Sequence, residues 1–166
     1  PKPAREERSG GGRPLGEIVR QPVFVVAVIS AAFGYGITNL RMVATPLAMD
    51  FCSHPFAQAA MVIQWHVVGM YAPGLFTGSL IRRYGVLKVI LAGVVLVGGC
   101  VAVALSGTTV THFLVALALL GVGWNFMYTG GTTLLTEAYA PAEKARAQGA
   151  NDFAVFATMG VSSFSS

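Results

Sequence analysis

Hydrophobic positions fall into four long runs separated by short polar segments, a pattern that predicts membrane-spanning helices. The clearest run extends from residue 56 to residue 81 and contains no Asp, Glu, Lys or Arg. A helix of about 26 residues is about 39 Å long, which exceeds the ~30 Å hydrocarbon core of a bilayer. Pro73 lies inside this run and predicts a kink, because its ring would collide with the carbonyl group of Gly69.

The remaining runs predict further spans at about residues 22–49, 86–106 and 112–139. A fifth run, 153–166, has about 14 residues, too few to cross a bilayer, so we expect a truncated helix and a fragment of a longer protein. Residues 140–152 are polar and predict a loop, with Asp152 capping the fifth helix. Residues 1–21 are rich in Gly, Pro and charge and predict a solvated linker. The fold class is therefore an all-α membrane protein, with a multi-pass helix bundle over 22–166.

Composition supports this class, because charged residues make up only 11% of the chain, against about 25% in soluble domains. The net charge of +4 does not indicate a nucleic-acid partner, since the cations sit at the ends of the hydrophobic runs. Cys52 and Cys100 are far apart and support neither a metal site nor a disulfide framework. We expect a lipid bilayer as the surroundings and no cofactor.

The distribution of Lys and Arg predicts the orientation of the spans. Five lie in residues 1–21, three in 82–88 and two in 140–152, which together are ten of the eleven. Cytoplasmic loops carry an excess of Lys and Arg, so these three segments are expected in the cytoplasm. The two intervening turns contain no Lys or Arg.

Arg41 is the remaining cation and lies within the first span, about 28 Å along the helix from Pro22. One interpretation is that its guanidinium reaches the external headgroups. The other is that it faces a polar cavity, where it would bind an anionic group or hold a gate. Gly34-Tyr35-Gly36 just before it is a place where the helix can loosen, and Asn39 lies nearby.

Gln64 and His66 are the polar residues of the second span, about 12 and 15 Å from its start. They are two positions apart, about 200° around a helix, so both cannot line one cavity. His66 is either a neutral histidine hydrogen-bonded to a neighbouring helix or a group that exchanges protons with water.

Trp124, Asn125 and Tyr128 lie near the middle of the fourth span, where tryptophan and tyrosine are unusual as interface anchors. Trp124 and Tyr128 are four positions apart and share a helix face. With several glycines around them, they predict either aromatic packing or the wall of a pocket for a cyclic or aromatic solute.

Residues 78–88 (GSLIRRYGVLK) resemble the loop motif G-x-x-x-D-R-x-G-R-[RK] of major facilitator superfamily transporters, with Lys88 closing the basic turn. Gly78, Arg83 and Gly85 match the motif, whereas Arg82 replaces its acidic residue and Val86 a basic one. The segment containing Pro141 and Arg146 is similar to the family's Pro-x-x-x-Arg loop. The resemblance covers nearly the whole chain and implies helices seven to ten followed by the start of helix eleven.

The resemblance implies the C-terminal half of a transporter, with the N-terminal half of the same protein as its partner. It implies that residues 1–21 form the cytoplasmic linker between the halves, and that the site lies at mid-membrane between them. The resemblance implies that the first and fourth spans border the central cavity, and that the second span and the fifth run also contribute to it. The cavity candidates are Tyr35, Asn39, Arg41, Gln64, His66, Trp124, Asn125 and Tyr128.

The sequence therefore predicts a secondary transporter in the plasma membrane, the inner membrane of a bacterium. It would move a small-molecule substrate by alternating access, with protons as the driving ion. No catalytic motif or metal-ligand cluster appears, so an enzyme is not expected. A membrane-embedded enzyme using dispersed groups and a non-transporting sensor or assembly subunit are the alternatives.

Overall fold

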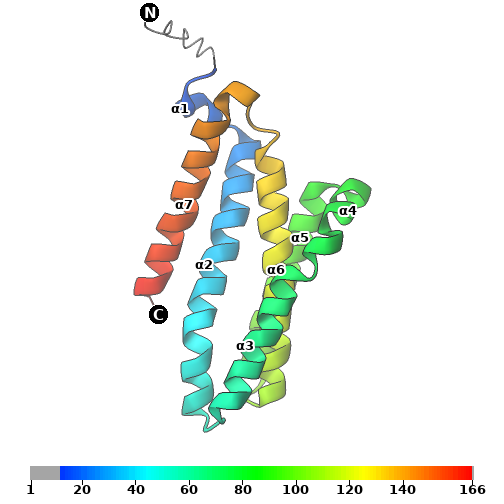
Figure 1. Ribbon diagram of the computed structural model, residues 1–166, viewed down its shortest axis with the longest axis vertical. Coiled ribbons are helices and arrows are strands. Elements are labelled where there is room, and N and C mark those ends of the chain that lie inside the picture. The colour runs from blue at the N-terminus through cyan, green and yellow to red at the C-terminus, as the bar shows by residue number, and fades with distance from the viewer. Residues whose placement is uncertain (1–11, 166) are drawn as a thin grey trace, which may run out of the picture.

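The computed structural model describes residues 12–165, and every secondary-structure element in that range is a helix. Short turns connect the helices (Figure 1). In chain order the elements are α1 (Leu15–Ile18), α2 (Pro22–Phe51), α3 (Phe56–Tyr71), α4 (Gly74–Tyr84), α5 (Val86–Ser106), α6 (Val110–Leu135), the 3-10 turn η1 (Pro141–Glu143) and α7 (Lys144–Phe164).

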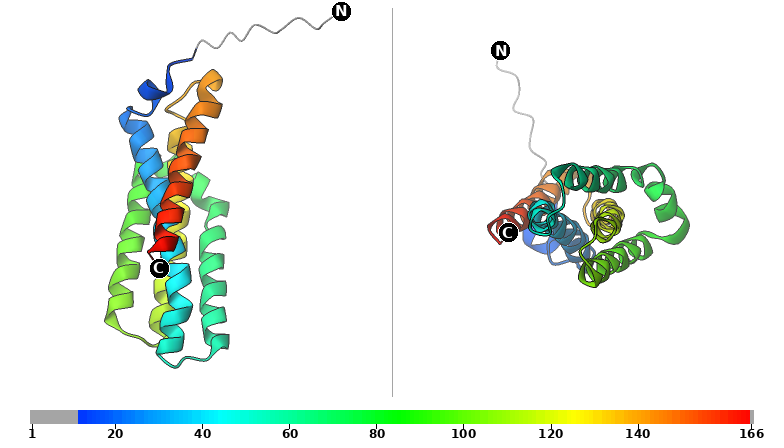
Figure 2. Two further views of the ribbon diagram at one scale, coloured as in Figure 1. Left: turned by 90° about the vertical axis from the view of Figure 1, so that its left-hand side faces the viewer. Right: turned by 90° about the horizontal axis from the view of Figure 1, so that it is seen from below.

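The long helices form a bundle in which α6 occupies the central place. α6 packs against α2, α3 and α5, while α7 packs against α2 on the other side. The view along the bundle axis shows α6 enclosed by α3, α4 and α5, with α2 beside it (Figure 2). Side chains of α6 therefore face three neighbouring helices, and α6 carries three of the eight candidate residues.

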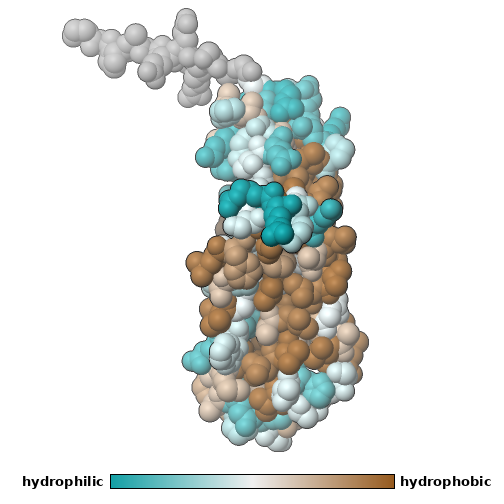
Figure 3. Space-filling view, turned by 90° about the vertical axis from the view of Figure 1, so that its right-hand side faces the viewer, coloured by the Kyte–Doolittle hydropathy of each residue, from teal (hydrophilic) through white to brown (hydrophobic). Residues whose placement is uncertain are grey.

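Three helices, α2, α5 and α6, are each long and apolar enough to cross a membrane. α3 and α4 pass the same test together as one bent span, with an angle of 41° between them. The surface agrees: hydrophobic residues dominate the middle of the molecule, and hydrophilic residues gather toward the end that carries α1 (Figure 3). The all-α membrane fold is confirmed, with three candidate spans, or four when α3 and α4 are counted as one bent span.

The second span is broken, not simply kinked. α3 ends at Tyr71 and α4 begins at Gly74, so the predicted kink at Pro73 is a full interruption of the helix. Pro73 explains the interruption, because proline has no backbone N–H group to donate within the helix. Its ring also crowds the carbonyl group four residues earlier. α4 also continues to Tyr84, three residues past the predicted end at 81.

The fourth and fifth spans differ from the sequence expectation at the end of the molecule near α1. α6 ends at Leu135, not at 139, and α7 begins at Lys144, not at 153. The predicted loop 140–152 was therefore wrong over most of its length, and Asp152 lies inside a helix and does not cap one. Its polar residues suit a helix because Ala, Lys, Arg and Gln have high helix propensity, and Ala147 and Asn151 bury the inner face.

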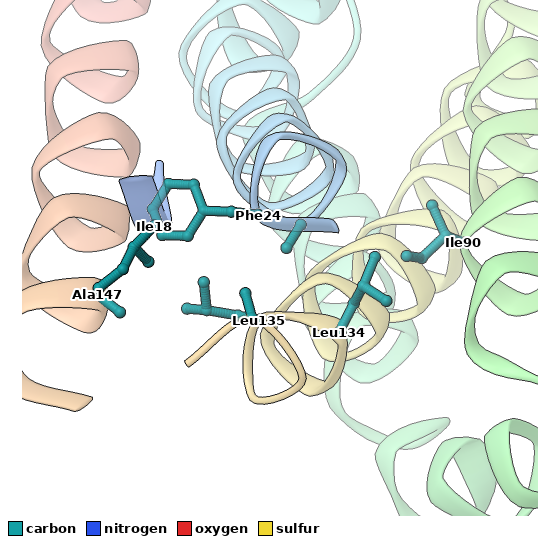
Figure 4. Close-up of a cluster of buried hydrophobic side chains, with 8 residues drawn as sticks. Ile18, Phe24, Ile90, Leu134, Leu135 and Ala147 are labelled. Atoms are coloured by element: carbon teal, nitrogen blue, oxygen red, sulfur yellow. The ribbon is translucent and has the colours of Figure 1, made fainter. Parts of the chain in front are cut away.

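The last part of the predicted linker, residues 12–21, is packed against the bundle. Ile18 of α1 is fully buried and belongs to a cluster with Phe24, Leu135 and Ala147 (Figure 4). The side-chain amide of Gln21 donates to the carbonyl oxygen of Ala138 at 2.9 Å. This segment is thus held between α2 and α7 and is not a freely solvated chain; residues 1–11 of the predicted linker lie outside the described residues.

Candidate functional site

Three of the predicted cavity residues form one aromatic cluster between α2 and α6. Trp124 and Tyr128 lie on adjacent turns of α6, and their rings stack with centroids 5.0 Å apart and planes 9° apart. Tyr35 of α2 meets both rings edge-on, at 5.3 Å from Trp124 and 5.1 Å from Tyr128. Stacked and edge-to-face arrangements are the favoured geometries of aromatic pairs, so these rings hold one another in place.

Tyr71 is a fourth member that the sequence analysis missed. It is the last residue of α3, it lies edge-on to Trp124 with centroids 6.1 Å apart, and 65% of it is exposed. The available signal was a tyrosine in mid-span directly before the Ala72-Pro73 break. We call Tyr35, Tyr71, Trp124 and Tyr128 the aromatic platform.

The platform contains one unsatisfied hydrogen-bond donor. Trp124 is only 4% exposed, and its Nε1 has no hydrogen-bond partner among the described residues. A buried N–H group without an acceptor is costly. The indole N–H group is therefore a buried donor whose hydrogen-bonding capacity is unused in this conformation.

Apolar side chains of α7 border the platform. Ala31, Ala32 and Val155 form a buried hydrophobic cluster, and Tyr35, Tyr128 and Met159 pack against it. The platform thus combines flat rings, apolar edges and a free N–H group, a composition typical of pockets for planar, weakly polar ligands.

Asn125 follows Trp124 but faces the break between α3 and α4, not the platform. Its side-chain Nδ2 donates to the carbonyl oxygen of Met70 at 2.7 Å, and its Oδ1 lies 2.6 Å from the hydroxyl of Thr77. The 100° step between successive helical residues places the two side chains on different faces of α6.

Gln64 and His66 lie on different sides of α3, as their spacing predicted. Gln64 is exposed, whereas His66 is fully buried against α6. His66 Nδ1 is 2.7 Å from the carbonyl oxygen of Leu117, which makes Nδ1 the protonated nitrogen, since a carbonyl only accepts. Nε2 has no hydrogen-bond partner among the described residues.

The two remaining cavity candidates on α2 lie apart from the platform. Asn39 faces α7, where its Nδ2 is 2.9 Å from Ser162 Oγ and 2.8 Å from Ser163 Oγ. Arg41 faces a different cleft of about 230 Å³, which it lines together with Thr45 and Thr108. The eight predicted residues are therefore divided among several places, and three of them share one site.

The motif segment forms the turn between α4 and α5. Gly85 is the single residue between these helices and has φ 91° and ψ 149°, a region essentially restricted to glycine. Arg83 lies over the ring of Tyr84 at 5.4 Å, while Gly78 and Lys88 are exposed on α4 and α5. The backbone conformation between α4 and α5 thus explains the glycine at position 85. The cations of the motif lie on the surface.

The strongest polar contact of the described residues lies outside the spans, at the end that carries α1. Glu143 Oε2 is 2.8 Å from Nη2 of Arg13, and Glu143 Oε1 accepts from the Arg13 Nε and backbone N–H groups. These bonds, with one from the Ala140 amide, lower the pKa of Glu143 to about 2 and raise that of Arg13. We call this contact the Arg13–Glu143 clamp.

Comparisons with known proteins agree with this architecture. A family model described as the Major Facilitator Superfamily matches residues 1–164. The chain belongs to the major facilitator superfamily. The resemblance inferred from the 78–88 motif is therefore confirmed, and the chain is part of an integral membrane protein.

Three curated relatives are similar along most of this chain. The riboflavin transporter RfnT of Brucella anthropi is 46% identical over 153 residues, which are 92% of this chain and 38% of that protein. Two Bacillus subtilis proteins named as uncharacterized MFS-type transporters, YddS and YdeG, are 32% and 34% identical over 86% and 70% of this chain. The chain spans 38%, 33% and 28% of these relatives' lengths. No solved structure matches it. That all three relatives are named transporters supports the expectation that the chain is not an enzyme.

Proposed function

We propose that this chain is the C-terminal half of a secondary transporter that moves a flavin, in the first instance riboflavin, across the bacterial plasma membrane. The observation that carries the substrate class is the aromatic platform with its free indole N–H group. The family membership supports transport, and the relative named as a riboflavin transporter supports the substrate.

The chemistry of the platform suits a flavin ring system. Stacking of a flat heterocycle on aromatic side chains is worth about 1–3 kcal/mol per ring in nucleic-acid complexes. The isoalloxazine ring is flat and carries carbonyl groups at one edge. In this proposal its ring lies against the exposed Tyr71 edge of the platform, and Trp124 Nε1 donates to one of its carbonyl oxygens.

Transport proceeds by alternating access in this proposal, with the described helices forming one wall of a mid-membrane cavity. The N-terminal half of the same protein supplies the opposite wall. Residues 1–21, 82–88 and 140–152 lie in the cytoplasm, because they carry ten of the eleven cations.

A proton gradient drives accumulation, and His66 Nε2 takes up the proton. His66 is the histidine near the middle of a span. His54 lies in the α2–α3 turn, 2.7 Å from Thr108 O, and His112 lies in the first turn of α6, 2.7 Å from Thr109 Oγ1. Its Nδ1 hydrogen is already engaged by the Leu117 carbonyl group, which leaves Nε2 as the nitrogen that can bind a proton.

The test is uptake of radiolabelled riboflavin by cells or proteoliposomes that contain the full-length protein. Trp124→Ala should lower uptake at least tenfold at unchanged protein level, because it removes the centre of the platform. Trp124→Phe should retain part of the activity, since it keeps a ring and loses only the N–H group.

The matched control is Trp65→Ala, because Trp65 is 56% exposed on α3 and lies away from the platform. It should transport almost normally. Full uptake by Trp124→Ala would contradict the proposed site, and absence of riboflavin uptake by the unaltered protein would contradict the substrate. A protein that binds riboflavin but never moves it would be a sensor, not a transporter.

A further inference from the structure

We propose that Asn125 and Thr77 form a releasable latch across the α3–α4 break, and that this latch positions the aromatic platform. Asn125 is thus a positioning residue and not a substrate ligand. The inference rests on the proposed transport function for its consequence, but its structural part is independent of any substrate.

The first observation is the hydrogen bonding of the broken span. In an unbroken helix the amide of Gly74 would donate to the carbonyl group of Met70. At the break, Asn125 Nδ2 donates to the Met70 oxygen at 2.7 Å in its place. A residue of α6 therefore completes the end of α3, which otherwise would leave a carbonyl group without a donor.

The second observation is that the same amide also holds α4. The Thr77 hydroxyl donates to Asn125 Oδ1 at 2.6 Å. Thr77 is fully buried, with 0% of its surface accessible. One side chain of α6 thus contacts the last turn of α3 through its nitrogen and the first turn of α4 through its oxygen.

The third observation gives the latch a second state. The Thr77 hydroxyl is also 2.7 Å from the carbonyl oxygen of Pro73, within its own helical turn. A hydroxyl has one hydrogen and serves one strong acceptor at a time. When α4 separates from α6, that hydrogen turns to Pro73, so Thr77 stays satisfied and release leaves no buried hydroxyl without a partner.

The latch is next to the proposed binding site. The rings of Tyr71 and Trp124 meet with centroids 6.1 Å apart. The Asn125–Met70 hydrogen bond joins the residues directly beside them, since Asn125 follows Trp124 in α6 and Met70 precedes Tyr71 in α3. At its far end α4 leads into the Arg82–Lys88 turn. Movement of α4 about the break is thereby linked to the spacing between Tyr71 and Trp124.

Two isosteric changes test the latch in the full-length protein. Thr77→Val removes the hydroxyl and keeps the shape of the side chain. Thr77→Ser is the converse variant, which keeps the hydroxyl and loses the methyl group. The control is Thr133→Val, because the Thr133 hydroxyl donates to the Thr129 carbonyl group of its own helix, at 2.7 Å. Asn125→Leu removes both bonds at once.

The substrate-independent measurement is the distance between spin labels at positions 56 and 84, with Cys52 and Cys100 replaced by serine. Both positions are exposed, at 86% and 51%, and they mark the two far ends of the broken span. Thr77→Val should broaden the distance distribution and shift its mean by about 3 Å, the change that a further bend of about 20° produces over helices of this length. Thr77→Ser and Thr133→Val should match the unaltered protein.

The functional measurement is the KM and maximal rate of riboflavin uptake. Thr77→Val should raise KM about fivefold, because the aromatic platform adopts its binding geometry for a smaller fraction of the time. The maximal rate should be unchanged or higher, because α4 separates from α6 more easily. An unchanged distance distribution in Thr77→Val would overturn the latch, and a changed distribution with an unchanged KM would overturn its link to the platform. If Asn125→Leu fails to fold, the Thr77 variants still test the latch. If riboflavin is not transported, the distances between the spin labels still test it.

Discussion

The two sides of α6 hold their neighbours by different means. Toward α3 and α5, glycines bring the backbones into contact: a Cβ atom on Gly121 would lie 2.6 Å from the His66 carbonyl oxygen, and one on Gly123 would lie 3.0 Å from the Gly93 carbonyl oxygen. Toward α2 there is also a glycine contact, because a Cβ atom on Gly131 would lie 2.8 Å from the Ala27 carbonyl oxygen. At mid-height, however, rings make the contact, with Tyr35 against Trp124 and Tyr128. We call these the glycine side and the aromatic side.

This difference separates what is rigid from what can change. Backbones in direct contact leave no room for a side chain or a solute, and small residues permit such close approach in membranes. Rings that meet edge-on are held by side-chain contacts, which rotamer changes can open and close. A binding surface is therefore expected on the aromatic side, with the glycine side as its fixed support.

The largest expected effect comes from breaking the glycine side. Gly121→Val places a branched side chain where only 2.6 Å separates a Cβ atom from the backbone of α3, and overpacking of this kind costs about 1–3 kcal/mol or more. We expect a large loss of folded protein and of its melting temperature in detergent. Gly98→Val is the control, because nothing lies within 4 Å of a Cβ atom there; equal losses in both variants would show that valine itself, not the contact, is harmful.

The next effect concerns His66, which lies on the glycine side yet is proposed to carry the proton. His66→Gln can still donate to the Leu117 carbonyl group but cannot take up a proton near neutral pH. We expect uphill riboflavin accumulation to fall at least fivefold, while exchange of internal for external riboflavin persists. Normal accumulation by a well-folded variant would place the coupling group elsewhere in the full-length protein, and His66→Leu should in addition lower stability by leaving the carbonyl group without its donor.

A smaller effect is expected from the Arg13–Glu143 clamp, which holds the start of α7 beside the aromatic side. Because the folded protein lowers the pKa of Glu143 from 4.5 to about 2, the ionised carboxylate stabilises the fold above about pH 4.5. This contribution is lost progressively as the pH falls toward 2. Glu143→Gln should lower the melting temperature at pH 7 and flatten its decline between pH 4.5 and 3, measured in detergent. The same decline in Glu143→Gln as in the unaltered protein would assign the acid effect to other carboxylates.

The smallest effect is expected at the exposed turn after α4. Arg83 occupies the basic position of the family motif, whereas Arg82 replaces its acid and bonds Ser79 of the same helix at 3.0 Å. Arg83→Ala should lower riboflavin uptake about twofold to threefold and Arg82→Ala less. Equal, slight losses would indicate that the pair only sets the orientation of the span.

Much of the fold followed from the sequence because a membrane imposes simple rules. Apolar length, proline and the placement of cations depend on a few neighbouring residues, and they predicted four spans, a kink at Pro73 and the boundaries of α5 at Val86 and Ser106. The start of α7 was missed. Residues 144–152 were taken for a loop because they are polar, yet polarity alone does not distinguish a loop from a helix that leaves the membrane.

The candidate site shows where sequence reasoning stops. That Trp124 and Tyr128 share a face followed from their spacing, since residues four apart lie on adjacent turns. The addition of Tyr35 and Tyr71, and the separation of Asn125, Asn39 and Arg41 from the platform, depended on how α2, α3 and α7 are placed around α6. Those placements come from contacts between residues up to about 120 positions apart, such as Asn39 with α7. Periodicity assigns a side chain to a face of its own helix, but only the packing of several helices decides which face meets which.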